Sequence, residues 1–412
     1  MSRSAKKQKE LNNPLTARAL NISAKEDLFS LLSHLSIDID RTSERLLAEL
    51  APFAIAVYPQ EDPAAPRLSR YSIAGFKKFI PFPLINKKLN AVLLSATPAA
   101  IQKLIDYLRA SDDANDAAFA ESVAAAMANY FVKPAPMKIG VRDFIFGNRC
   151  YIMGVLNVTP DSFSDGGRFL NPRKALNRAL ELAQNGADII DIGGESSRPS
   201  AKPIPANEEL KRIIPVIAAI RKRSDIPISV DTTKADVAEA ALSEGADMIN
   251  DISGLRFDEK LAIVAAEAKV PLCIMHSRHT PLTMQKKVAY KEPVTEIIGE
   301  LRQSVKRAER GGVPSSRIIV DPGIGFSKSA EHNLAILRRL DEFRVFGMPI
   351  LVGPSRKSFI GAVTGARVEE RLPGTIAAVA FAVARGADFV RVHDVKEVAQ
   401  AVKLSIGIRG EI

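Results

Sequence analysis

The sequence has little cysteine and histidine and no long apolar run. Its 412 residues include two cysteines, Cys150 and Cys273, and five histidines, and these are not grouped at the spacing of a zinc site. Two isolated cysteines predict no disulfide framework, so we expect a reducing, cytoplasmic location. No apolar run reaches the roughly 18 residues of a membrane span, and no apolar segment of a signal peptide follows the basic start.

A concentrated basic patch is also missing. The net charge is +10, but no basic block is longer than the opening nine residues, and no basic stretch carries interleaved aromatic side chains. We therefore expect neither nucleic acid nor membrane as a partner. A mild positive bias would attract anionic small-molecule substrates instead.

The length and composition indicate two domains. Hydrophobic residues make up 46% and charged residues 25%, the balance of a globular protein. We assign residues 1–20 to a disordered basic lead-in, 21–140 to a small α+β domain of unknown role, and 141–412 to a catalytic domain. In the small domain the patterns predict helices over 26–37, 41–50, 97–109 and 117–131, and strands over 53–58 and 90–95.

After residue 140 the pattern becomes regular, because short apolar runs alternate with amphipathic helices. The sequence Gly-Ala-Asp precedes three of these runs, at 186–188, 245–247 and 386–388, and its glycine is suited to ending a helix. The runs are Tyr151–Leu156, Asp188–Ile192, Pro227–Val230, Asp247–Ile249, Leu272–Met275, Ile318–Val320, Ile350–Val352 and Phe389–Val392. Eight such units predict an α/β fold, a (β/α)8 barrel. A doubly wound open sheet is the alternative, but no G-x-G-x-x-G sequence follows the first run.

Polar residues follow every predicted strand, at the barrel end where active sites form. An aspartate in such a position is commonly a helix N-cap, but a full ring of polar groups favours a ligand site. Three of them, Asp231, Asn250 and Asp321, suit a flat heterocycle with several N–H groups. Lys357 and Arg356 could donate to its ring atoms or to a carboxylate.

The apolar and cationic groups at these strand ends complete the predicted site. Met275 and Phe326 could pack on the faces of the ring. Arg391 and His393 on the last strand would lie beside Asn157 on the first, and together they suit a pyrophosphate or a Mg²⁺–pyrophosphate.

The stretch Ile152 to Gly167 comprises the first barrel strand and the long polar loop that follows it, and it contains Asn157, Phe163 and Asp165. This stretch closely resembles the first signature of the dihydropteroate synthases, which join a pterin to para-aminobenzoate in folate synthesis. The resemblance extends over about 148–405. It is carried by Asp-Ile-Gly-Gly-Glu-Ser-Ser-Arg-Pro, Ile-Ser-Val-Asp-Thr, Ile-Asn-Asp-Ile, Asp-Pro-Gly-Ile-Gly-Phe, Ser-Arg-Lys-Ser and Arg-Val-His-Asp-Val.

The resemblance implies a role for each matching residue. Asp231, Asn250, Asp321 and Lys357 would hold the dihydropterin. Asn157 would help to hold Mg²⁺, and Arg391 and His393 the pyrophosphate. Asp165 would lie on a loop that closes over the site. The para-aminobenzoate pocket would be shaped by Phe163, Ser197, Arg198, Pro199 and Ser358. It also implies a homodimer formed through barrel helices.

Two other functions remain open at this point. Methyltransferases that pass a methyl group from methyltetrahydrofolate to a corrinoid protein share the pterin-binding barrel, but they need no pyrophosphate corner. A non-catalytic pterin-binding or RNA-binding protein is the other alternative. The family usually has threonine where Ser197 stands and glycine where Ser200 stands, which concerns loop detail rather than the reaction.

Overall fold

The computed structural model describes residues 15–21, 53–59, 84–86, 91–95, 98–159, 172–198, 201–280, 282–284 and 288–410. Contacts divide the chain into two compact units, Met1–Val132 and Lys133–Ile412; the sequence had placed this boundary at 140/141. The helices predicted over 26–37 and 41–50 lie outside the described residues.

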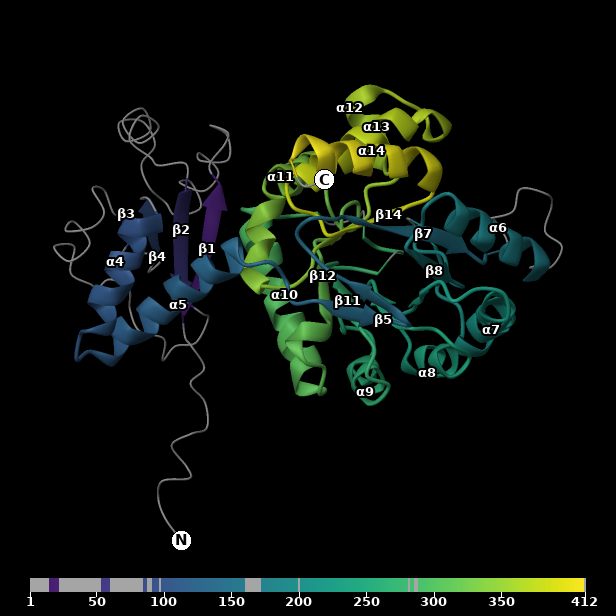
Figure 1. Ribbon diagram of the computed structural model, residues 1–412, viewed down its shortest axis with the longest axis horizontal. Coiled ribbons are helices and arrows are strands. Elements are labelled where there is room, and N and C mark those ends of the chain that lie inside the picture. Colours follow the sequence, from purple (N-terminus) through teal and green to yellow (C-terminus); the bar gives the residue numbers. More distant parts are fainter. Residues whose placement is uncertain are drawn as a thin grey trace, which may run out of the picture. The chain divides into compact units, whose positions relative to one another are not determined.

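The described residues of the first unit form an antiparallel sheet and the helices α4 (Pro98–Arg109) and α5 (Ala114–Phe131) (Figure 1). The strands are β1 (Leu15–Asn21), β2 (Phe53–Pro59), β3 (Leu84–Asn86) and β4 (Ala91–Ser95), in the order β1-β2-β4-β3. The two helices follow, and α4 buries Ile101, Leu104, Ile105 and Leu108 at helical spacing.

Two details of this unit correct the sequence analysis. Residues 15–20, assigned to a disordered lead-in, belong to β1, whose backbone pairs with β2 along its whole length. Helix α5 begins at Ala114 rather than Ala117, because Asp113 caps it by accepting a 2.8 Å hydrogen bond from Asn115 N.

The second unit contains the predicted barrel. The eight barrel strands are all parallel: β7 (Tyr151–Asn157), β8 (Ile189–Gly193), β9 (Ile228–Asp231), β10 (Met248–Asp251), β11 (Leu272–Met275), β12 (Ile318–Asp321), β13 (Leu351–Val352) and β14 (Phe389–Val392). Their order is β12-β11-β10-β9-β8-β7-β14-β13. A parallel bridge between Val320 and Ile350 joins the two ends of this sheet. The expectation of a (β/α)8 barrel is thus confirmed, and the open-sheet alternative is wrong.

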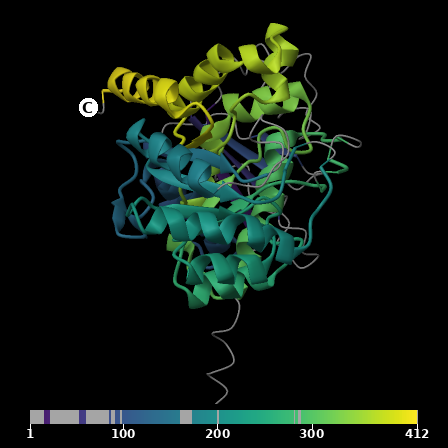
Figure 2. The same cartoon turned by 90° about the vertical axis from the view of Figure 1, so that its right-hand side faces the viewer.

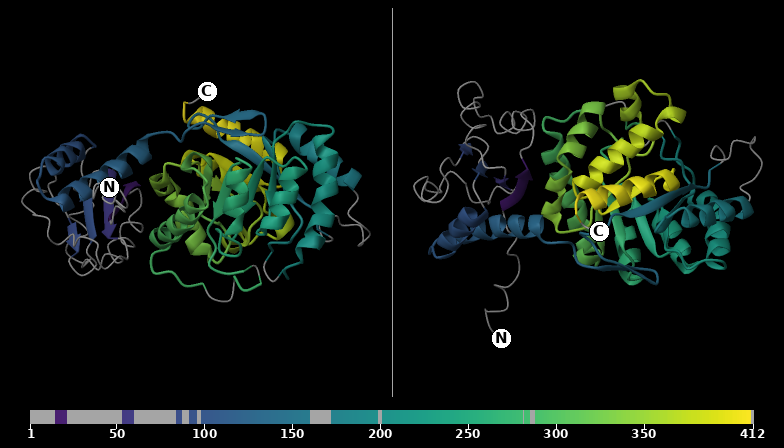
Figure 3. Two further views of the ribbon diagram at one scale, coloured as in Figure 1. Left: turned by 90° about the horizontal axis from the view of Figure 1, so that it is seen from below. Right: turned by 45° about the horizontal axis from the view of Figure 1, so that its top comes forward.

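Helices follow each strand and surround the sheet (Figures 1 and 3). Figure 2 brings the teal helices α6 to α8 to the front. The helices are α6 (Pro172–Gln184), α7 (Ala206–Arg221), α8 (Ala235–Ser243), α9 (Lys260–Glu267), α10 (Pro293–Arg310), α11 (Ala330–Arg338), α13 (Leu372–Ala384) and α14 (Val395–Ile408). The short helix α12 (Ser358–Thr364) after β13 was not predicted.

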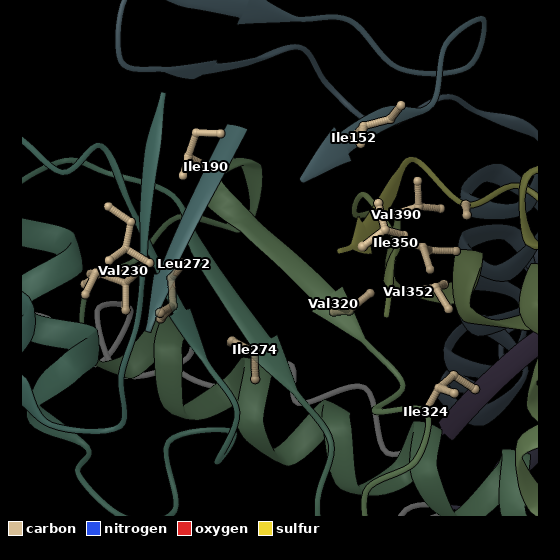
Figure 4. Packing of buried hydrophobic residues seen from close by; sticks show 14 of the residues in the cluster. Ile152, Ile190, Val230, Leu272, Ile274, Val320, Ile324, Ile350, Val352 and Val390 are labelled. Carbon is tan, nitrogen blue, oxygen red and sulfur yellow. The ribbon is translucent and has the colours of Figure 1, made fainter. Parts of the chain in front are cut away.

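Alternation along the strands separates two apolar layers. One set of side chains, including Ile190, Val230 and Val390, packs with helix residues in a large outer cluster (Figure 4). The residues beside them in sequence turn into the barrel. There they pack against a hairpin, β5 (Met137–Ile139) and β6 (Arg142–Phe144), that the sequence analysis missed. The inner layer consists of Met153, Ile189, Met248, Cys273, Ile319, Leu351 and Phe389.

The three Gly-Ala-Asp sequences form one repeated structure. Each glycine has a positive φ, between +88° and +108°, as expected for a helix C-terminus. Each aspartate then accepts a backbone N–H at the start of a neighbouring strand. Asp188 accepts from Ile152 at 2.8 Å, Asp247 from Ile228 at 2.9 Å, and Asp388 from Ile350 at 2.9 Å. These carboxylates therefore fix the strand starts, at the opposite end of the barrel from the predicted site.

Candidate functional site

A polar layer lies directly above the inner apolar layer of the barrel. Because side chains on one face of a strand recur every second residue, the residue two positions after an inner apolar residue also points inward. On β8, β10, β11, β12 and β14 these residues are Asp191, Asn250, Met275, Asp321 and Arg391. Four of the five belong to the predicted site, and the closed barrel brings them to one mouth.

Arg391 links the acidic residues of this layer. Its Nε donates to Asp191 Oδ2 at 2.6 Å, and its Nη2 donates to Asp231 Oδ2 at 2.7 Å. Asn250 Nδ2 lies 3.3 Å from Asp191 Oδ2. One guanidinium therefore serves two carboxylates on adjacent strands, and Asp231 Oδ1 and the oxygen of Asn250 stay available to accept from a ligand.

Burial and charge shift the titration of this cluster. Burial, which Arg391 opposes and Asp191 reinforces, raises the pKa of Asp231 above its usual value. For Arg391 burial disfavours the charge, but Asp191 and Asp231 outweigh it and raise the pKa of the guanidinium. The cluster therefore keeps its cation at all relevant pH values.

Asp321 and Lys357 form the opposite side of the mouth. Asp321 Oδ1 accepts from Gly323 N at 2.7 Å, which leaves its second oxygen for a ligand. Lys357 Nζ donates to the carbonyl of Ile324 and lies 4.4 Å from the centre of the Phe326 ring. Burial, reinforced by Arg391 and opposed by Asp321, lowers the pKa of Lys357 to about 7.

Apolar side chains of the same loops and strand ends form a small buried cluster. Met275 and Phe326, both predicted to contact a ring, are buried in one cluster together with Met284, and Ile252 packs against it. Methionine and aromatic side chains are suited to the faces of a flat heterocycle. Neither Met284 nor Ile252 was predicted as a site residue: Met284 lies in a loop away from any strand end, and Ile252 is an apolar residue directly after β10, where the prediction considered polar groups.

His393 and Asn157 are, with Arg391, the residues predicted for a pyrophosphate corner. His393 N donates to Ser355 Oγ at 3.3 Å, and that hydroxyl lies 3.0 Å from His393 Nδ1. If the hydroxyl donates to Nδ1, the neutral ring carries its proton on Nε2 and can offer an N–H to an anion. Burial and the nearby Arg391 lower the pKa of His393 to about 4. The positive charge of this corner therefore resides on Arg391.

Asn157 lies at the end of β7, partly exposed. A Cβ atom built on Gly193 would lie 3.7 Å from Asn157 Oδ1 and 3.6 Å from Asp231 Oδ2. The amide oxygen and the carboxylate thus flank the same glycine on β8, so a side chain at Gly193 would fill the space between them.

The side chains of the Ser-Arg-Lys-Ser segment, residues 355–358, have different surroundings. Arg356 has a left-handed backbone, φ +55°, and forms an ion pair with Asp394, in which Arg356 Nε donates to Asp394 Oδ2 at 2.8 Å. Ser358 is exposed and is the first residue of α12. Arg356 therefore has a protein partner, whereas Ser358 is accessible to a substrate.

The predicted para-aminobenzoate residues are only partly described. Ser197 and Arg198 lie in the loop after β8, where Ser197 lines a small hollow shared with Asp231, Thr232 and Ile252. Arg198 is exposed. Phe163, Asp165 and Pro199 lie outside the described residues, so their predicted roles stay predictions.

Two buried polar residues, Asp191 and Lys328, were not predicted as site residues. Asp191 was recognised as a strand end but not as a site residue, because its partner Arg391 is 200 positions away in the sequence. Lys328 is buried, and its Nζ donates to Phe326 O at 2.9 Å and lies 3.0 Å from His276 Nδ1. The period-two pattern of β8 could have identified Asp191, whereas no local signal marks Lys328.

The donor set bears on the predicted Mg²⁺. The part of the chain that the structure describes contains no cluster of three or more histidine, cysteine or acidic side chains able to enclose a metal ion. Asn157 offers one amide oxygen at the mouth. This fits Mg²⁺ in particular, because that ion keeps several waters and is commonly bound by one or two protein oxygens plus substrate phosphates.

Comparisons with known proteins agree with this geometry. The family model described as "Pterin binding enzyme" matches residues 153–393. Dihydropteroate synthase from Synechocystis sp. is 49% identical over 284 residues, which cover 68% of this chain and 96% of that protein. The enzyme of the same name from Bacillus subtilis is 47% identical over 259 residues, covering 63% and 88%.

Solved structures give the same result. A Clostridium difficile dihydropteroate synthase crystallised in the presence of pteroic acid is 46% identical, with a TM-score of 0.61, and covers 64% of this chain and 98% of its own. The Xanthomonas albilineans enzyme with 4-aminobenzoic acid is 38% identical, with a TM-score of 0.63 and coverage of 68% and 99%.

Proposed function

The chain belongs to the pterin-binding enzyme family and, within it, to the dihydropteroate synthases, and on this basis we propose how its residues perform the reaction. It is a transferase of folate biosynthesis. It condenses 6-hydroxymethyl-7,8-dihydropterin pyrophosphate with para-aminobenzoate, which gives 7,8-dihydropteroate and pyrophosphate. The observation that carries the residue roles is the ring of Asp231, Asn250, Asp321 and Arg391 at one barrel mouth.

The pterin packs against Met275 and Phe326. Its N–H groups donate to Asp231 Oδ1, to the amide oxygen of Asn250 and to the free oxygen of Asp321. Arg391 occupies Asp231 Oδ2, so it orients the carboxylate without competing for the ligand. Lys357 leaves the carbonyl of Ile324 and donates to a ring carbonyl or nitrogen atom.

The leaving group is bound at the corner of Arg391, His393 and Asn157. The bond between the pterin methylene carbon and the pyrophosphate oxygen breaks, and the pyrophosphate departs with the electron pair. Arg391 stabilises this charge, and neutral His393 donates an N–H from Nε2. Mg²⁺ held by Asn157 and the diphosphate would supply further charge neutralisation when bound.

The electron-rich dihydropterin stabilises the positive methylene carbon, and the amine of para-aminobenzoate attacks it. A carbon–nitrogen bond forms, and the amine releases one proton to water. No protein nucleophile takes part. Ser197, Arg198, Pro199, Phe163 and Ser358 bind para-aminobenzoate, and Asp165 stabilises the cation, as the resemblance implies.

The functional alternatives from the sequence receive no support. The relatives and structures compared above are dihydropteroate synthases, not corrinoid methyltransferases or non-catalytic binders. Both cysteines are free and buried, which supports a reducing, cytoplasmic location. In the described part of the chain, no helix has the length and apolarity needed to cross a membrane.

A second copy of this chain is the proposed partner. A groove of about 350 Å³ on the outside of the barrel is almost wholly apolar and is lined by residues of α11, α12 and α13. Val363 and Phe381, at its edge, are 60% and 41% exposed. Exposed apolar area of this kind marks an interface, and the resemblance implies a homodimer formed through barrel helices.

The reaction is tested directly. The protein is mixed with 6-hydroxymethyl-7,8-dihydropterin pyrophosphate, para-aminobenzoate and Mg²⁺, and dihydropteroate and pyrophosphate are measured. Equal amounts of both products are expected, with EDTA abolishing turnover if Mg²⁺ is required. Asp231→Asn should abolish pterin binding, whereas the matched change at exposed Asp225 should not. No product from the wild-type protein would refute the function.

A further inference from the structure

An ion-pair network connects the loop after β8 to the loop after β9 and to helix α7. Lys234 Nζ donates to Glu195 Oε2 at 2.6 Å and to Glu209 Oε2 at 2.5 Å. The side chain of Glu209 is completely buried, and those of Glu195 and Lys234 are 22% and 26% exposed. The network is thus largely shielded from water. Opposite charges that are shielded in this way attract each other more strongly than charges at the surface.

Glu195 also closes the loop that begins with it. Its Oε2 accepts a 3.1 Å hydrogen bond from Ile204 N, so one carboxylate oxygen joins the two ends of segment 195–204. Next to it, Arg212 Nη1 on α7 donates to Gly194 O at 2.8 Å. A Cβ atom on Gly194 would lie 3.0 Å from Glu209 Cγ and 2.8 Å from a methyl of Ile213, so glycine allows the strand end to lie against α7.

The network borders the active site without forming part of the pterin-binding layer. Glu195, Lys234 and Glu209 line the same small hollow as Ser197 and Asp231. Lys234 stands three residues after Asp231, at the start of α8, and Glu195 stands two residues before Ser197. The cation of Lys234 therefore ties the strand that carries a pterin ligand to the loop that carries Ser197.

Burial disfavours a charge on Lys234, but the hydrogen bonds to Glu195 and Glu209 outweigh it and raise the pKa of the ammonium above its usual value. The cation therefore persists throughout the working pH range. Glu209 Oε1 is buried with no hydrogen-bond partner among the described residues. Lys234 is thus the ionic partner of a carboxylate that has no access to water.

We propose that Glu195 and Lys234 are positioning residues that hold the loop of Ser197 and Arg198 in place for para-aminobenzoate. Neither touches a reacting atom. The inference rests on the proposed function, since it assumes that Ser197 contacts this substrate. The ion-pair network contacts the loop for para-aminobenzoate and not Asn250, Asp321 or Lys357. Its loss should therefore affect the binding of para-aminobenzoate and of the dihydropterin differently.

The test compares both substrates in Glu195→Gln, Lys234→Met and Lys234→Arg. The KM for para-aminobenzoate comes from turnover, and the Kd for the dihydropterin comes from its fluorescence, which no tryptophan obscures because the chain has none. Glu121→Gln is the matched control, since Glu121 forms an exposed 2.8 Å ion pair with Arg109 in the first unit.

We expect Glu195→Gln and Lys234→Met to raise the KM for para-aminobenzoate about tenfold or more, as for other small misplacements of a substrate-binding group. The Kd for the dihydropterin should change by less than about twofold, because the pterin groups keep their own partners. In Lys234→Arg the KM for para-aminobenzoate should return most of the way to the wild-type value. Glu121→Gln should have the wild-type KM and Kd.

Other results would distinguish a failure of this inference from a failure of the proposed function. Lys234→Met leaves the charge of Glu209 buried alone and is the variant more prone to unfold; Glu195→Gln keeps the pair of Lys234 with Glu209 and then carries the test. An unchanged KM in Glu195→Gln, or a parallel rise in the Kd for the pterin, would overturn the inference. A wild-type protein without turnover would instead refute the proposed function.

Discussion

The ammonium of Lys357 lies 4.4 Å from the centre of the Phe326 ring, at the mouth of the barrel. The cation also donates a hydrogen bond to the carbonyl of Ile324, so it is held where a pterin would meet it. A cation over an aromatic face gains roughly 0.5–2 kcal/mol, depending on its exposure to water. Lys357 therefore needs no large movement to exchange this carbonyl for a substrate atom.

Lys357→Met should abolish most activity. The variant keeps the length of the side chain but loses the donor to the pterin, and kcat/KM should fall about a hundredfold or more, as for loss of a charged hydrogen bond. Steady-state kinetics would measure this. Lys396→Met, on the exposed face of α14, is the control and should leave kinetics unchanged.

The same lysine should make stability depend on pH. Its pKa is lowered to about 7 in the folded protein and stays near 10.4 when unfolded. Between these values the unfolded chain binds more protons, so stability rises with pH from 7 to 10. Urea unfolding of wild type and Lys357→Met at several pH values should show a smaller rise in the variant. Parallel curves would contradict the assignment.

His276 should contribute acid sensitivity. Burial and the nearby Lys328 lower its pKa to about 3, and Glu300 only partly opposes them. Below the unfolded pKa near 6.5 the unfolded chain binds the extra proton, so stability falls as the pH falls. The His276→Asn variant should lose up to about 1.4 kcal/mol of this dependence per pH unit. An undiminished slope between pH 6.5 and 4.5 would argue against it.

Asp247 should be important for stability and not for catalysis. Its carboxylate accepts from Ile228 N at 2.9 Å and pairs with Arg221 at 2.6 Å, at the barrel end away from the site. Asp247→Ala leaves the amide of Ile228 without its acceptor and removes the ion pair of Arg221, which keeps its bonds to the carbonyls of Gly245, Ser224 and Ile226, and should cost about 1–3 kcal/mol of unfolding free energy. Asp247→Asn keeps an acceptor and should cost less. A change in KM for either substrate would contradict this role.

Phe381→Glu should disrupt the proposed dimer. Phe381 lines the apolar groove of α11, α12 and α13, and a carboxylate buried at an interface without a partner is costly. Light scattering should show half the wild-type mass at the same concentration. Leu404→Glu places the same charge on α14, at a 66% exposed residue outside that groove, and should keep the wild-type mass.

The structural features that could be predicted from the sequence are those that depend on neighbouring residues. The Gly-Ala-Asp turns and the apolar runs located the barrel strands, since a helix stop and a buried strand depend on neighbouring residues. Missed features depend on distant contacts. The hairpin of β5 and β6 packs against inner residues of the barrel, and its three-residue strands are too short to show a period. Helix α12 likewise lacks the length for a clear pattern.

The sequence by itself determined the barrel, the ring of polar strand ends and the family, because strand alternation and motif order are written in consecutive residues. Only the tertiary structure decided how those groups are paired. Arg391 shares its guanidinium between Asp191 and Asp231, which precede it by 200 and 160 positions, and Lys234 bridges Glu195 and Glu209 from a third loop. Such pairings arise when barrel closure sets the distances between strands, and no local pattern encodes those distances.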